Sequence, residues 1–144
     1  EKGLTVATME SCTGGLLANI LTNVNGSSAY FKGGIISYTN ELKVDSGVPA
    51  ELIENYGVVS EQVAEFMARA VRERLGSDLG VGITGVAGPE PLENQPPGVV
   101  YIGVAHPNGS HASYYRFPAN NRNLVKHRAV ISALLDVRRV LMLL

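Results

Sequence analysis

Short apolar runs alternate along the chain with stretches whose apolar residues recur every three or four positions. The short runs have the length and the β-branched content of strands. They cover residues 4–8, 35–38, 79–84 and 99–105. Helical spacing covers residues 13–24, the segment that opens at Ser60, and residues 121–144, and two shorter helices are expected to follow Asn40 and Pro49.

Turn residues indicate how these elements connect. Pro107-Asn108-Gly109 is a hairpin signal, so a strand over 113–117 is expected to run antiparallel to the strand over 99–105. The order of strands and helices predicts an α/β fold in three layers, with a mixed, mostly parallel sheet of about five strands. Residues 85–98 are rich in glycine and proline and too long for a bare connector, so we expect them to be functional or partly mobile.

Composition and charge narrow the class of protein. The 144 residues fit one domain over 1–144, and 45% hydrophobic residues suffice for a sizeable core. A net charge of −1 gives no general attraction to nucleic acid or anionic membranes, and no apolar run is long enough to span a bilayer. One cysteine and three scattered histidines predict neither an internal disulfide nor a zinc site, which fits a cytoplasmic protein.

The segment richest in chemical groups is Glu10-Ser11-Cys12-Thr13-Gly14-Gly15, directly after the first strand. Its glycines lack a Cβ and so let a ligand approach the backbone. The predicted helix that follows presents free N–H groups in its first turn, and these attract anions. In α/β proteins a functional site commonly lies where a strand gives way to a helix in this manner.

Six segments in this order resemble the C-terminal domain of the CinA family. They read ESCTGG (10–15), GSSAYF (26–31), GGIISYTNELK (33–43), GVVSE (57–61), ITGVAGP (83–89) and FPANNR (117–122). The resemblance covers nearly the whole chain and implies a three-layer α/β/α sandwich with a mixed sheet. It also implies the family's known activity, hydrolysis of the carboxamide of nicotinamide mononucleotide to nicotinic acid mononucleotide and ammonia, with neither a metal nor an organic cofactor.

Amide hydrolysis requires a nucleophile, a proton shuttle and donors for the developing oxyanion. No histidine falls inside a resembling segment, so we favour a hydroxyl activated by lysine and tyrosine. Ser11 is the first choice of nucleophile, with Lys43 as base or proton relay and Tyr38 passing a proton or orienting the amide. Partial burial would lower the pKa of Lys43 toward neutrality.

Simpler roles stay open for each of these residues. Ser11 can be a helix cap, and Ser28, which lies in another resembling segment, is a rival nucleophile. Cys12 is the better nucleophile if the helix start lowers its pKa, although a lone cysteine is more often a small buried hydrophobe. Lys43 alone would be read as a solvated lysine, and Tyr38 can simply pack.

The implied substrate also carries a phosphate and a cationic pyridinium ring. The negative charge of Glu10 either balances the positive charge of the ring or complements the positive end of the following helix. Arg122 and Lys126, one turn apart, are phosphate ligands or a solvated helix face. The other candidates for binding offer backbone groups and small side chains: Thr13, Gly14, Gly15, Thr84, Gly85, Ala87 and Gly88.

Two segments depart from the family pattern. After Gly88-Pro89 the family loop carries paired glycines, whereas this chain reads EPLENQPP over residues 90–97. Near residue 120, where the family has Gly-Asp-Arg, this chain reads Ala119-Asn120-Asn121-Arg122, which loses the carboxylate and adds a residue. Lys126 stands where arginine, with its bidentate fork, is common. The alternative to an active enzyme is therefore a nucleotide-binding module of the same family with altered catalysis.

The family's competence and damage-inducible naming suggests a role with nucleic acid, which the near-neutral charge disfavours. We also expect the chain to form a homo-oligomer.

Overall fold

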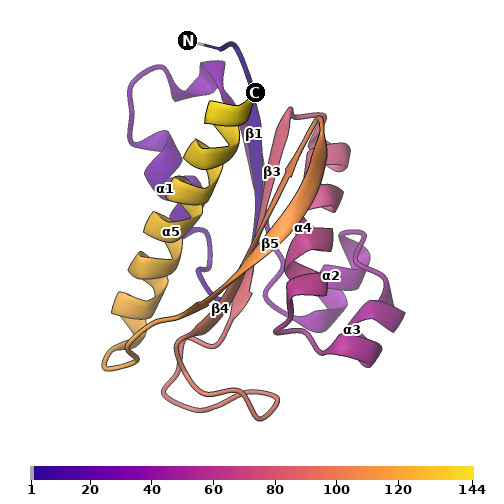
Figure 1. Cartoon of the computed structure of the whole chain (residues 1–144), viewed down its shortest axis with the longest axis vertical. Coiled ribbons are helices and arrows are strands. Elements are labelled where there is room, and N and C mark those ends of the chain that lie inside the picture. The colour runs from indigo at the N-terminus through magenta and orange to yellow at the C-terminus, as the bar shows by residue number, and fades with distance from the viewer. Residues whose placement is uncertain (1) are drawn as a thin grey trace.

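The computed structural model describes residues 2–144, and its centre is a five-stranded sheet in the order β2-β1-β3-β4-β5 (Figure 1). The strands are β1 (Val6–Glu10), β2 (Phe31–Ile36), β3 (Leu79–Gly85), β4 (Val99–His106) and β5 (Gly109–Arg116). β1 pairs in parallel with β2 and β3, whereas the β3–β4 and β4–β5 pairings are antiparallel. The predicted mixed sheet of five strands is confirmed, with two antiparallel pairings where one was expected.

Helices cover both faces of the sheet, which confirms the α/β/α sandwich (Figure 1). α1 (Leu16–Thr22) and α5 (Arg122–Leu143) lie on one face. On the other face lies α4 (Glu61–Leu75), flanked by α2 (Asn40–Asp45) and α3 (Ala50–Tyr56). A short 3-10 helix, η1 (Ser27–Ala29), precedes β2. Within residues 2–144, no helix combines the length and apolar character that crossing a membrane requires.

The helix predicted over residues 13–24 begins only at Leu16 and ends at Thr22. Gly14 and Gly15 have φ angles of +61° and +104°, in the left-handed region that favours glycine. These angles break the helical path, so residues 13–15 form a turn between β1 and α1. The two glycines thus shape the backbone of the segment in which the sequence analysis expected the site.

Alternation along β1 decides which layer each side chain meets. Ala7 and Met9 pack in the core on the α4 side, whereas Val6 packs on the α1–α5 side. Glu10 also faces α1, because its carboxylate binds backbone N–H groups of that helix. The next residue, Ser11, therefore returns to the side on which α2 and α4 lie.

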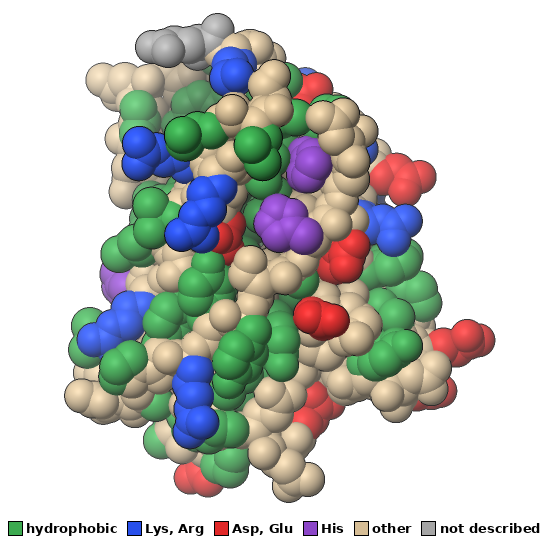
Figure 2. All heavy atoms as spheres, in the orientation of Figure 1, with side chains coloured by type: hydrophobic (Ala, Val, Ile, Leu, Met, Phe, Trp, Pro, Cys, Tyr) green, Lys and Arg blue, Asp and Glu red, His purple; other side chains and the backbone are tan. Residues whose placement is uncertain are grey.

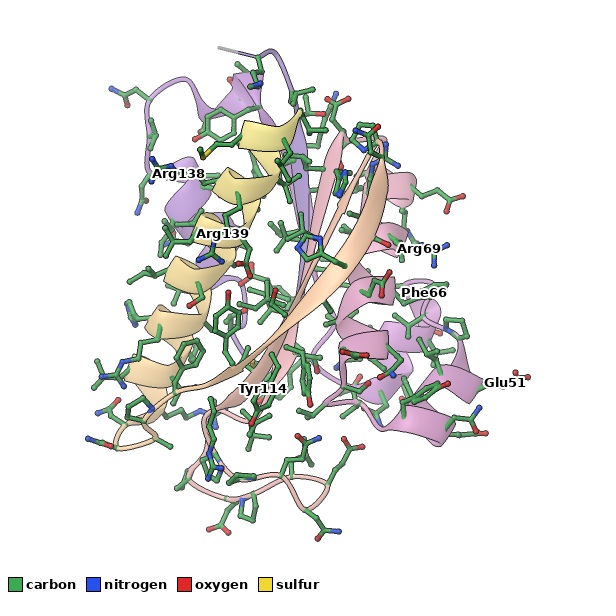
Figure 3. The ribbon with its side chains drawn as sticks, viewed as in Figure 1. Glu51, Phe66, Arg69, Tyr114, Arg138 and Arg139 are labelled. Atoms are coloured by element: carbon green, nitrogen blue, oxygen red, sulfur yellow. The ribbon has the colours of Figure 1, made fainter. Side chains whose placement is uncertain are left out.

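α4 packs unusually close to the sheet because glycines line its path. A Cβ on Gly82 would lie 2.4 Å from the Ala64 carbonyl oxygen, and one on Gly103 would lie 2.3 Å from the same atom. The outward side of α4 is polar, and there the Arg69 guanidinium lies 5.3 Å from the centroid of the Phe66 ring (Figure 3). The inner side of α4 thus packs backbone to backbone against the glycines of the sheet, and its outer side faces solvent.

Candidate functional site

Glu10 is the last residue of β1, and its carboxylate closes the start of α1. One oxygen accepts hydrogen bonds from the Thr13 hydroxyl (2.6 Å) and the Leu17 N–H (2.8 Å), and the other accepts from the Ala18 N–H (3.0 Å). The side chain of Glu10 is 1% exposed. A negative group at this position complements the positive end of the helix. Of the two roles weighed for Glu10, the geometry supports this one, and the protein itself supplies the anion at the start of α1.

Lys43 reaches the end of β1 from α2. This short helix is capped by Thr39, whose hydroxyl accepts a hydrogen bond from the Leu42 N–H at 3.1 Å. Lys43 lies in the last turn and is 1% exposed. Its Nζ atom is 2.9 Å from Ser11 Oγ, 2.7 Å from the Ser37 carbonyl oxygen and 3.3 Å from the Tyr38 carbonyl oxygen. The fold therefore joins a buried amine to a serine hydroxyl 32 residues away in the chain.

The three partners of Lys43 determine what its amine can do. Carbonyl oxygens only accept hydrogen bonds, so the carbonyls of Ser37 and Tyr38 hold two N–H bonds of the amine. The third tetrahedral position points at Ser11 Oγ. In the ammonium form this position is an N–H that donates to the hydroxyl, and in the neutral form it is a lone pair that can accept the hydroxyl proton.

Burial lowers the pKa of Lys43 to about 8, while the negative charge of Glu93 acts in the opposite direction. An amine with this pKa is neutral in roughly one molecule in ten at pH 7 and in half of them at pH 8. Burial raises the pKa of the Cys12 thiol to about 12, so Cys12 stays a neutral thiol inside the core. Of the two roles weighed for Cys12, the geometry supports the small buried hydrophobe.

Arg122, the first residue of α5, connects Tyr38 to the long loop. Its guanidinium donates hydrogen bonds to the Tyr38 hydroxyl, at 3.1 Å, and to the Gly88 carbonyl oxygen. The hydrogen bond from Lys43 thus reaches the main-chain carbonyl of Tyr38, and Tyr38 is 55% exposed. An open pocket of about 340 Å³ lies beside these groups. It is lined by Tyr38, Arg122 and residues 85–92, which include Gly85, Ala87 and Gly88.

The turn between β1 and α1 lies against the start of α5. A Cβ on Gly14 would be 3.8 Å from Lys126 Nζ, so the ammonium group of Lys126 stands over this turn. The Gly14 N–H donates to the Ser11 carbonyl oxygen at 3.0 Å and is used within the turn. Lys126 and Arg122 are therefore both at the end of the molecule that carries Ser11.

Of the predicted site residues, Ser28 lies apart from this group, whereas Thr84 directly follows Ile83, whose carbonyl oxygen accepts a hydrogen bond from the Ser11 N–H at 3.0 Å. Ser28 is exposed in η1, before β2, where the Tyr30 carbonyl accepts from the Val6 N–H at the first residue of β1. Ser28 is thus at the opposite end of the sheet from Ser11. Thr84 is 1% exposed, and its hydroxyl donates to the Val58 carbonyl oxygen at 2.9 Å.

The loop between β3 and β4 extends from the end of the sheet at which α5 begins (Figure 1). It has a defined fold, because Leu92 and Gln95 exchange two backbone hydrogen bonds across Glu93 and Asn94. The Glu93 carboxylate accepts from the N–H groups of Val58 and Val59, both at 2.9 Å. Glu93 has no signal of its own in the sequence, since no local pattern indicates a contact with residues 34 and 35 positions away.

Metal-binding groups do not gather at this site. Across residues 2–144, the His, Cys, Asp and Glu side chains form no group of three or more that could hold a metal ion. The chemistry that the arrangement offers is that of a hydroxyl beside an amine, with two cationic side chains nearby.

Comparison with known proteins identifies the family. A model of the CinA C-terminal domain matches residues 1–141. The CinA-like protein of Rippkaea orientalis is 47% identical over 99% of this chain and 35% of its own length. A putative competence-damage inducible protein of Desulforamulus reducens is 44% identical over 93% of this chain and 33% of its own length. The chain thus spans about a third of the length of these curated relatives.

Solved structures agree with the sequence matches. The competence/damage inducible protein CihA from Agrobacterium tumefaciens superposes with a TM-score of 0.91 at 36% identity, covering 95% of this chain and 85% of its own. A CinA superfamily protein from Escherichia coli gives a TM-score of 0.92 at 31% identity, covering 96% of this chain and 81% of its own. Because the model of this domain matches residues 1–141, the chain belongs to the CinA family and corresponds to its C-terminal domain.

Proposed function

We propose that this chain hydrolyses the carboxamide of nicotinamide mononucleotide to nicotinic acid mononucleotide and ammonia, with Ser11 as nucleophile and Lys43 as base. The observation that carries the proposal is the 2.9 Å contact between Lys43 Nζ and Ser11 Oγ in a buried setting. A hydroxyl becomes a nucleophile when an adjacent base can take its proton. Family membership supports the class of substrate, and the pair of residues supports the type of reaction.

The proposed reaction proceeds in two halves. Neutral Lys43 takes the hydroxyl proton as Ser11 Oγ attacks the carboxamide carbon, and the ammonium so formed gives a proton to the departing nitrogen, which leaves as ammonia. Water then attacks the acyl-serine as Lys43 accepts its proton, the ester C–O bond breaks, and Lys43 returns the proton to Ser11 Oγ, which leaves the carboxylic acid product and the free serine. Because the Gly14 N–H is used within the turn, the N–H groups of Thr13 and Gly15 are the proposed donors to the oxyanion.

The rest of the nucleotide is proposed to occupy the pocket beside Tyr38. Arg122 and Lys126 supply positive charge for the phosphate. Backbone groups of Gly85, Ala87 and Gly88 line the same space. Since the phenol of Tyr38 contacts Arg122, its proposed part is to orient the substrate rather than to relay a proton from Lys43.

Ammonia release from nicotinamide mononucleotide tests the proposal. Ser11→Ala removes the nucleophile, and Lys43→Met keeps a side chain of similar length without an amine. We expect each to lower kcat/KM at least about a thousandfold. Ser28→Ala is the matched control, because it makes the same change at the far end of the sheet, and it should leave kcat/KM unchanged. Full activity of Lys43→Met, or loss of activity in Ser28→Ala, would contradict the assignment.

A nucleotide-binding module without turnover is the second candidate, motivated by the proline-rich loop over residues 90–97. Prolines and a leucine fix a backbone that glycines would leave adaptable, so this loop shapes the pocket differently from the family pattern. This alternative predicts that nicotinamide mononucleotide raises the melting temperature while no ammonia forms. Formation of product at a rate that depends on Lys43 excludes it.

A further inference from the structure

The long loop is fixed to the rest of the molecule at its tip. Glu93 and Asn94, at the tip, have φ angles of +51° and +61°, a left-handed conformation that side chains other than glycine rarely adopt. Such a conformation persists only where surrounding contacts impose it. Here the Glu93 carboxylate supplies them, because it receives two charge-assisted hydrogen bonds from the backbone N–H groups of Val58 and Val59.

The receiving corner, residues 57–59 between α3 and α4, is built to accept this carboxylate. Gly57 has a φ of +81°, and a Cβ there would lie 2.9 Å from Glu93 Oε1. The Gln95 side-chain N–H donates to the Val59 carbonyl oxygen at 2.6 Å. The GVVSE segment, for which the proposed reaction has no use, therefore has a structural purpose as the anchor for the loop.

A second contact fixes the loop at its base, where Arg122 donates to the Gly88 carbonyl oxygen. Residues 89–92 run between the two anchors and line the pocket together with Tyr38 and Arg122. The position of this wall therefore depends on both contacts. Losing the anchor at the tip would free one side of the pocket without touching Ser11 or Lys43.

We propose that Glu93 is a positioning residue that pins the loop tip to residues 57–59 and thereby fixes the pocket wall of residues 89–92 against which the nucleotide binds. The substrate in this statement rests on the proposed function, whereas the pinning of the loop does not.

Amide hydrogen exchange tests the pinning without any need for turnover. We compare the wild type with Glu93→Gln, which keeps the shape but removes the charge and one acceptor. Exchange at the N–H groups of Val58 and Val59 should become at least about tenfold faster. The control is Glu51→Gln, the same change on α3 at a side chain that projects into solvent (Figure 3), and exchange there should match the wild type. Equal exchange in Glu93→Gln and the wild type would overturn the proposal.

Steady-state kinetics test the effect on the pocket. With nicotinamide mononucleotide at about pH 9, where Lys43 is mostly neutral, Glu93→Gln should raise KM about tenfold while kcat changes less than about threefold, because the lost interaction then acts on the binding wall and not on the reacting groups. Glu93→Asp, which restores the carboxylate on a shorter stem, should recover part of the KM. A fall in kcat at constant KM would show that Glu93 does not act through the pocket wall and would overturn that half of the proposal.

The failure of this inference is distinguishable from failure of the proposed function. If the wild type releases no ammonia, the proposed reaction falls, and the exchange experiment still decides whether Glu93 pins the loop, with the dissociation constant of the nucleotide replacing KM. If Glu93→Gln does not fold, Glu93→Asp is the second variant, because its shorter stem weakens the bonds to the N–H groups of Val58 and Val59 and should speed their exchange. Unchanged exchange in a folded Glu93→Asp would then count against the anchor.

Discussion

Lys43 is the residue on which the chemistry of this molecule depends. A lysine is almost never fully buried without partners, because its charge is costly to remove from water. Here two main-chain carbonyls and one hydroxyl take the place of water around the amine. Burial penalises the ammonium form and so lowers the pKa of the amine, and perturbed amines of this kind concentrate at functional sites.

The pKa of Lys43 predicts the direction of the pH dependence. A general base must be neutral, so kcat/KM should rise with pH as the amine loses its proton and level off above about pH 8. Below this pKa the rate should fall tenfold per pH unit. Rates measured between pH 6 and pH 10 check the prediction, with Lys43→Arg as a variant that stays charged throughout and should be inactive at every pH. A rate that falls as pH rises through 8 would show that the ammonium form is required instead.

At the residue scale, the sequence alone points to Ser11 and Lys43 but does not reveal the distance between them. Ser11 and Ser28 were rivals because both stand in turns of resembling segments. The structure separates them, since β1 runs parallel to β2 and carries Ser11 to the end at which α2 begins. The carbonyl partners of Lys43 had no sequence signal, because every residue possesses a carbonyl and only the fold decides which ones meet the amine.

At the scale of elements, the approach of α4 to the sheet depends on the glycines of β3 and β4. Gly82→Ala would place a methyl group 2.4 Å from the Ala64 carbonyl oxygen, where backbone on both sides leaves nothing to move aside. We expect a loss of about 2–3 kcal/mol in the free energy of unfolding, as for other overpacked cores. Urea denaturation measures it.

Gly26→Ala is the control for this change. Gly26 has a φ of +83° and no other group within 4 Å, so alanine there tests backbone strain without crowding. The strain should cost only about 1 kcal/mol. An equal loss in the two variants would show that crowding against α4 is not the reason for glycine at position 82.

The elements differ in how well their sequence patterns predicted them. The Pro107-Asn108-Gly109 signal correctly predicted the β4–β5 hairpin, because a tight turn is a local property. The antiparallel pairing of β3 with β4 was not expected, since it is made across the long loop over 86–98 by contacts that no local pattern encodes. Helix α1 begins at Leu16 rather than at Thr13 because the φ angles of Gly14 and Gly15 are incompatible with a helix there, and it ends at Thr22, two residues before the predicted end.

For the whole molecule, charge distribution bears on the choice of partner. On the face shown in Figure 2, basic side chains lie mainly over α5 and acidic ones mainly over the α3–α4 side. Part of the positive charge on α5 is used internally, since Arg139 forms a 2.8 Å salt bridge with the buried Asp136. With a net charge of −1, no excess of positive charge remains to attract a polyanion.

We therefore expect no useful affinity for nucleic acid. The dissociation constant for a labelled DNA duplex at physiological salt should be no tighter than about 0.1 mM, the weak end of non-specific binding. Fluorescence anisotropy measures it. Micromolar binding that weakens as salt is added would contradict this expectation and revive a role with DNA.

The homo-oligomer and the cytoplasmic location stay predictions. Light scattering of the purified chain measures its molar mass and so its oligomeric state.

Local interactions determined what the sequence alone could predict here: the α/β class, the hairpin, the three main helices and the turn after β1 that carries Ser11. These follow from apolar spacing, turn residues and caps, all of which act over a few neighbours. Tertiary structure alone decided that Lys43 meets Ser11, that Arg122 joins Tyr38 to the loop, and that Glu93 reaches residues 57–59. Each of these contacts joins segments far apart in the chain, and its energy exists only once the sheet and both helical layers have brought the partners together.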